Sequence, residues 1–80
     1  MAIDREKNKK LLVKDDGLLE IIKFAIDMER DAQDLYDDGY RYAKNPTAKE
    51  MFRLLLDEEI AHEKNLEKIY KEIHDFLSLS

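Results

Sequence analysis

Apolar and small side chains recur in steps of four and three over residues 18–43, which is the spacing of one face of a helix. Three small members, Ala25, Ala32 and Gly39, recur every seven residues and would let another helix approach closely. The pattern predicts one long amphipathic helix over about residues 17–43. The full first stripe is Leu18, Ile22, Ala25, Glu29, Ala32, Tyr36, Gly39 and Ala43.

A second stripe with the same spacing follows a short corner. Asn45 is a favourable helix N-cap, and Pro46 at the first helical position needs no backbone donor. The sequence therefore predicts a helix over about residues 46–77 that runs antiparallel to the first. The second stripe is Ala48, Phe52, Leu55, Glu59, His62, Leu66, Ile69, Ile73 and Phe76.

The first 15 residues form a separate, basic segment. Residues 1–14 carry five basic and two acidic side chains around a short apolar run. A short helix, a docking arm and a disordered tail are all compatible with that composition. We therefore divide the chain into an N-terminal arm, residues 1–15, and a helical hairpin, residues 16–80.

A hairpin of two helices cannot cover both stripes, and a chain of 80 residues buries little surface alone. Two hairpins together make a four-helix bundle. The expected fold class is therefore all-α, an antiparallel two-helix hairpin that dimerises into a four-helix bundle.

Three polar side chains, Glu29, Glu59 and His62, interrupt the apolar stripes. They lie sixteen residues before Asn45 and fourteen and seventeen residues after it, or about 24, 21 and 25 Å along the helices. The three groups should therefore face one another at one height. Buried ions cost several kcal/mol unless they are paired, and neither stripe contains Lys or Arg. We interpret the three residues as metal ligands.

A two-fold related second chain would bring four carboxylates and two imidazoles together, and two divalent cations would neutralise that charge. One glutamate would be a terminal ligand and the other a bridge, and spacing does not say which. The chain contains no cysteine, so the ligand set suits iron, manganese or zinc. Two alternatives stay open: a metal that only stabilises the dimer, and a metal-free interaction module.

Segments within residues 25–70 resemble the ferritin-like di-iron superfamily, in particular its rubrerythrin branch and the two-helix encapsulated ferritins. The thirty-residue interval between Glu29 and Glu59 is similar to that of encapsulated ferritins. Rubrerythrins also carry a cysteine-ligated iron, which a chain without cysteine lacks. The segments that carry the resemblance are Ala25-Ile26-Asp27-Met28-Glu29 with Tyr36, Lys44-Asn45-Pro46, and Asp57-Glu58-Glu59-Ile60-Ala61-His62.

The resemblance implies a ferritin-like bundle with a di-iron site shared between two chains, which oxidises Fe(II) with dioxygen or peroxide. A rubrerythrin-like peroxide reductase is the alternative activity. Tyr36 would either pack in the core or act beside the ligands as a hydrogen-bond partner or redox-active phenol. Asp31 or Asp34 could orient the imidazole of His62, whereas His74 lies off the stripe and should be solvated.

The net charge of the chain limits the kinds of partner that it can bind. The net charge is −5, and residues 15–80 carry nine basic and seventeen acidic side chains, which argues against nucleic acid. No apolar run approaches the roughly 20 residues of a membrane span. We expect a soluble, cytoplasmic homo-oligomer, at least a dimer, with a higher ring left open. An encapsulin shell is also left open, although residues 76–80 do not match a shell-targeting peptide.

Overall fold

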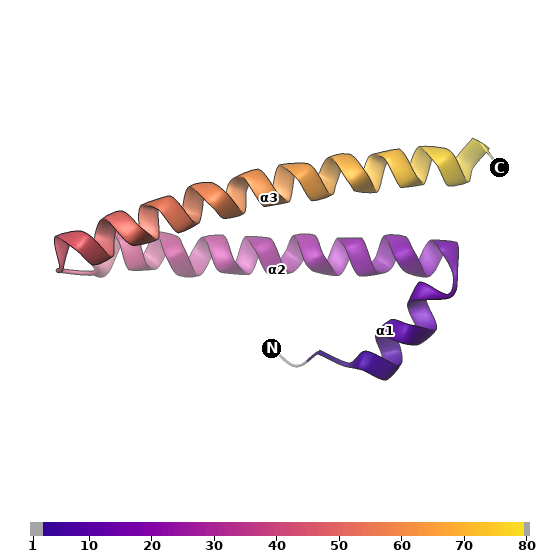
Figure 1. Ribbon diagram of the computed structural model, residues 1–80, viewed down its shortest axis with the longest axis horizontal. Coiled ribbons are helices and arrows are strands. Elements are labelled where there is room, and N and C mark those ends of the chain that lie inside the picture. Colours follow the sequence, from indigo (N-terminus) through magenta and orange to yellow (C-terminus); the bar gives the residue numbers. More distant parts are fainter. Residues whose placement is uncertain (1–2, 80) are drawn as a thin grey trace.

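The computed structural model describes residues 3–79, which form three α-helices and no strand within that range. Helices α2 (Asp15–Tyr42) and α3 (Pro46–Leu79) run antiparallel side by side, and α1 (Arg5–Leu12) folds back beside the first half of α2 (Figure 1). The all-α class and the antiparallel hairpin are confirmed. Helix α2 begins two residues earlier than predicted, and α3 ends two residues later.

The corner between α2 and α3 is fixed by hydrogen bonds at both helix ends. The Oδ1 atom of Asn45 accepts a hydrogen bond of 3.0 Å from the backbone N–H of Ala48, which makes Asn45 the predicted N-cap. The ammonium group of Lys49 donates to the carbonyl oxygen of Tyr40 over 2.7 Å. A lysine of α3 thus satisfies a carbonyl at the C-terminal end of α2, where a positive charge is favourable.

The N-terminal arm contains a short helix, as one of the three alternatives proposed. Asp4 caps α1 by accepting a 3.0 Å hydrogen bond from the backbone N–H of Lys7, yet no residue of α1 is buried. Its position depends on Gly17, because a Cβ at that residue would collide with the backbone of Leu11. Glycine therefore permits the close approach of α1 to the start of α2.

Ile22 and Ile26 are the buried hydrophobic side chains among the described residues, with 9% and 7% of their surfaces exposed. Ile26 lies outside the first stripe, so burial on α2 is not confined to the predicted stripe. Ile69 and Phe76 of the second stripe are 44% and 72% exposed. Two helices share one narrow contact, and the remainder of each stripe points outward because no third helix covers it.

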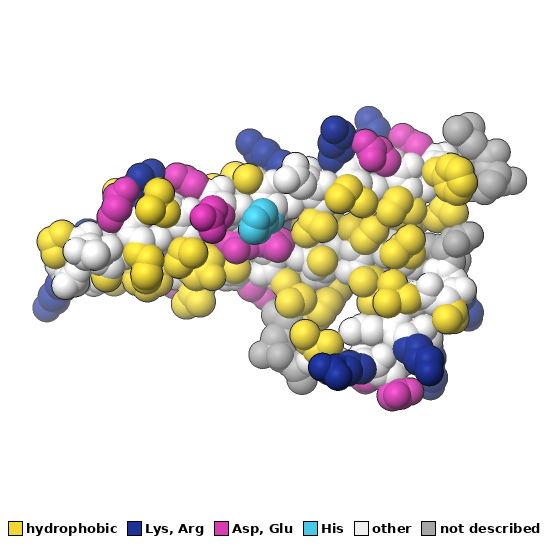
Figure 2. Space-filling view, viewed as in Figure 1, with side chains coloured by type: hydrophobic (Ala, Val, Ile, Leu, Met, Phe, Trp, Pro, Cys, Tyr) yellow, Lys and Arg dark blue, Asp and Glu magenta, His cyan; other side chains and the backbone are white. Residues whose placement is uncertain are grey.

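The uncovered residues define one side of the hairpin, which we call the open face. Apolar side chains of both helices gather on this side around a histidine (Figure 2). Residues seven apart on a helix share a face, and the open face consists of one such line on each helix. These lines are Ile21, Met28, Leu35 and Tyr42 on α2, and Leu55, His62, Ile69 and Phe76 on α3.

The closest approach near the corner predicts an unfavourable effect of Gly39→Ala. A Cβ at Gly39 would lie 2.5–2.6 Å from the ring atoms Cγ, Cδ1 and Cδ2 of Phe52. Alanine gains about 1 kcal/mol of helix propensity, but displacing the base of a packed ring costs about 1–3 kcal/mol. We expect a lower melting temperature, measured by circular dichroism.

The double variant Gly39→Ala with Phe52→Leu should recover the loss relative to Phe52→Leu alone, since the smaller side chain removes the collision. A single Gly39→Ala variant that melts at a higher temperature than the wild type would contradict the packing described.

Candidate metal centre

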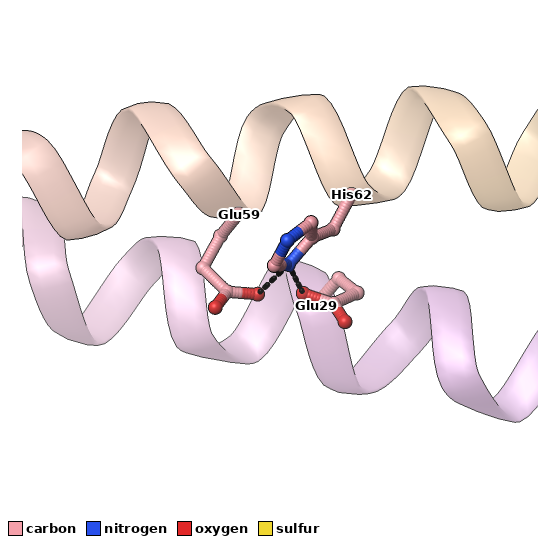
Figure 3. Close-up of side chains that lie close together, drawn as sticks. All are labelled: Glu29, Glu59 and His62. Atoms are coloured by element: carbon pink, nitrogen blue, oxygen red, sulfur yellow. Dashed lines mark ion pairs between the residues drawn. The ribbon is translucent and has the colours of Figure 1, made fainter.

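Glu29 of α2 and Glu59 and His62 of α3 converge at the middle of the hairpin (Figure 3). The Nδ1 atom of His62 lies 3.8 Å from an oxygen of Glu29 and 3.6 Å from an oxygen of Glu59. One ligand atom from each side chain lies within 4.8 Å of the other two. The structure therefore brings together all three residues that the sequence singled out.

The three side chains differ in their exposure to solvent. The Glu29 and Glu59 side chains are 23% and 17% exposed, whereas the imidazole of His62 is 55% exposed. The imidazole of His62 is therefore open to solvent in the single chain, unlike the two carboxylates. Glu29 and Glu59 lie toward the contact between the helices, while His62 belongs to the open face, which nothing in the described chain covers.

One carboxylate oxygen has no partner. Oxygen Oε2 of Glu29 is buried and accepts no hydrogen bond from any residue that the structure describes. His62 Nδ1, at 3.8 Å, is too distant to donate one. An unsatisfied buried acceptor costs about 1–3 kcal/mol, and more when it is charged. A cation bound between the three groups would remove that cost, and two carboxylates with an imidazole are ligands that iron, manganese and zinc accept.

A hydrogen-bond network joins the two helices one turn from the cluster. Gln33 Nε2 donates to the Glu63 carboxylate over 3.0 Å and to the carbonyl oxygen of Glu59 over 3.5 Å. Arg30 pairs with Glu63 at 3.2 Å and with Glu67 at 3.3 Å. The network fixes the axial position of α3 relative to α2 near Glu59.

Sequence reasoning assigned no role to Gln33 or Glu63. Glu63 is half-buried and receives hydrogen bonds from the neighbouring helix. A glutamine four residues after a stripe glutamate was the available signal, since residues four apart lie on one helix face. Burial, the largest single effect, raises the pKa of Glu63, but hydrogen bonds, including those from Gln33 and Arg30, together lower it below the ordinary value of 4.5.

The other residues singled out from sequence lie outside the cluster. The Tyr36 ring packs against Phe52 with a centroid distance of 6.4 Å, which favours the core-packing interpretation. Asp31 and Asp34 are exposed, and neither forms a hydrogen bond with His62 within the described residues. His74 is exposed, as expected, and stacks on Tyr70.

An antiparallel helical hairpin with carboxylates and a histidine clustered between its helices is typical of the helical carboxylate metalloproteins. A family model described as Rubrerythrin matches residues 20–79, which is three quarters of the chain and includes Glu29, Glu59 and His62. The chain belongs to the rubrerythrin family, within the ferritin-like superfamily.

Comparison with curated proteins and with solved structures found no match. Within the described residues, none of the helices combines the length and the apolar character that a membrane span requires.

The Gln33 network predicts a stability effect that depends on pH. The lowered pKa of Glu63 means that its carboxylate stabilises the fold above the pKa of the unfolded chain, and that this contribution is lost as the pH falls through the lower folded value. We expect Glu63→Gln to lower the melting temperature at pH 7, with the difference shrinking as the pH drops below 4.5.

Melting curves from pH 3 to 7, recorded with chelator, measure this difference. Glu72→Gln is a matched control on an exposed position of α3 and should show no such trend. A Glu63→Gln deficit that is equally large at pH 3 and pH 7 would refute the assignment.

Proposed function

We propose that the protein is a di-iron carboxylate protein whose site is completed by a second copy of the chain, and that it oxidises Fe(II) with dioxygen or peroxide. The unpartnered buried oxygen of Glu29, in reach of Glu59 and His62, carries this proposal. Membership of the rubrerythrin family supports iron as the metal.

The composition of the cluster supports a site shared by two chains. A single chain supplies two carboxylates and one imidazole, and it leaves the imidazole of His62 55% exposed. A second hairpin on the open face would cover these side chains and add the same three groups. Four carboxylates would then balance the charge of two divalent cations, whereas the two carboxylates of one chain balance the charge of one.

Each residue has a defined part in the proposed site. Glu29 and Glu59 would bind the iron through carboxylate oxygens, one as terminal ligand and one as bridge, and His62 would bind through an imidazole nitrogen. Gln33 and Glu63 would hold α3 so that Glu59 keeps its place.

Bound iron would supply the redox chemistry. Two Fe(II) ions give up one electron each, and dioxygen with two protons becomes hydrogen peroxide, or peroxide with two protons becomes two waters. The chain has no cysteine to hold the second iron centre through which electrons would return. We therefore favour Fe(II) oxidation over sustained peroxide reduction.

Metal content tests the shared site. Elemental analysis combined with mass-resolved chromatography should find two irons per two chains in protein loaded with Fe(II). Glu29→Ala and His62→Ala should each lose most of the iron, because each removes one ligand from both half-sites. Glu58→Ala, an exposed carboxylate beside the cluster, is the control and should retain it. Iron retained equally by all three variants would rule out the assigned ligands.

Turnover requires a separate measurement. Stopped-flow mixing of the Fe(II)-loaded protein with oxygen should produce ferric absorbance at least tenfold faster than with Glu29→Ala, in line with the hundredfold scale of losses when a catalytic group is removed. Equal rates of Fe(II) oxidation in the two proteins would rule out the proposed oxidase activity. A chelator-sensitive melting temperature without oxidation would instead indicate a structural metal.

A further inference from the structure

The open-face line of α2 is covered over one half only. Its members Ile21 and Met28 are half-buried, whereas Leu35 and Tyr42 are 64% and 76% exposed. The difference follows from α1, which lies beside the first half of α2 on the side away from α3, while no described segment lies on that side of the corner half (Figure 1). Two large apolar side chains therefore stand uncovered on one line of one helix.

Helix α1 lies outside the family match, which begins at residue 20. It has eight residues and none is buried, and an isolated helix of that length is marginal in water. A cleft of about 470 Å³ separates it from α2, with Leu11, Ile21 and Phe24 among its walls. An uncovered helix beside an apolar-lined cleft indicates a surface that a further segment covers.

We propose that this cleft receives Leu35 and Tyr42 of a second copy of the chain, so that α1 clasps the partner in the dimer. The proposal rests on the shared site of the proposed function. A two-fold axis through the cluster and perpendicular to the helices sets α2 against the α2 of the second copy in the opposite direction. Each α1 then lies beside the corner half of the other chain.

Spacing along α2 matches the two surfaces. Leu35 lies six residues after Glu29 and Phe24 five residues before it, or about 9 and 7.5 Å. Tyr42 lies thirteen residues after Glu29, and Gly17, which packs against the cleft residue Leu11, lies twelve before it, or about 20 and 18 Å. The two-fold reverses the direction of the helix, so the exposed pair of one copy falls level with the cleft of the other.

Charge complementarity identifies the occupant as a second copy. Arg5 and Lys9 of α1 are exposed, and so are Asp31 and Asp38 on the corner half of α2. None of these four forms an ion pair with another residue that the structure describes. Basic side chains of α1 lie on the same side of the molecule as the open face (Figure 2). The same two-fold would bring the two sets of opposite charge together.

A charge swap in the full chain tests the contact. Arg5→Glu with Lys9→Glu changes the formal net charge from −5 to −9, and adding Asp31→Lys with Asp38→Lys returns it to −5. Exposed pairs contribute little singly, but the two-fold repeats each pair. We expect the first double variant to raise the dimer dissociation constant about tenfold at low salt, by analytical ultracentrifugation, and the fourfold variant to restore it.

A matched control separates a specific contact from net charge. Glu72→Lys with Asp75→Lys also adds four charges, but on exposed positions of α3. Combined with Arg5→Glu and Lys9→Glu, these changes should leave the dimer weak. Equal restoration by both pairs of lysines, or no weakening by the first double variant, would overturn the proposal.

Cross-linking locates the contact directly, because the chain has no cysteine of its own. Metal-free Leu11→Cys chains mixed with Leu35→Cys chains should form a disulfide between the two under mild oxidation. If the two variants form no mixed disulfide while the wild-type protein binds two irons per dimer, the clasp alone is overturned. A protein that stays monomeric with iron would overturn the shared site and the clasp together.

Discussion

Two carboxylates held between packed helices, with no lysine or arginine paired to them among the described residues, impose the main constraint on this protein. The described residues offer the Glu29 oxygen neither a hydrogen-bond donor nor a charge of opposite sign within bonding distance. A fold tolerates such a group when a cation or a proton balances it. The position of His62 at the same level, on the exposed side, is consistent with a cation that reaches the cluster from the open face.

The constraint is effective only while the two helices keep their register. Glu29 and Glu59 are thirty residues apart, and a shift of one residue in α3 would move a ligand by about 1.5 Å along the axis and turn it by about 100°. The Asn45 cap fixes the corner, and the Gln33 network fixes the helices near the cluster. Together these polar contacts hold the two helices in register, as a large hydrophobic core does in a larger domain.

The hairpin and the N-terminal arm stand in different relations to the family. Residues 20–79 follow the rubrerythrin pattern and contain the whole cluster, whereas α1 precedes the match. In the proposed clasp, α1 would form a contact with the second chain that the hairpin alone does not form. Leu35 and Tyr42 of α2 are exposed in the single chain, and the clasp would cover them.

Local sequence determined the helices, the corner and the identity of the three clustered residues. Period, capping chemistry and distance from one corner are all properties of nearby residues, so they can be read before the fold is known. The same reasoning left the first 15 residues undecided between helix, arm and tail. That segment depends on a contact between Leu11 and Gly17, which only packing reveals.

Tertiary structure decided which side of each stripe became buried. Ile26 is buried although it is outside the first stripe, and Phe76 is exposed although it is inside the second, because two helices touch along a single narrow line. The roles of Gln33 and Glu63 depend equally on a neighbour thirty residues away. The sequence by itself determined which side chains occur at one height, and the tertiary structure decided which of them water can still reach, since solvent access depends on the relative rotation of two helices rather than on either helix alone.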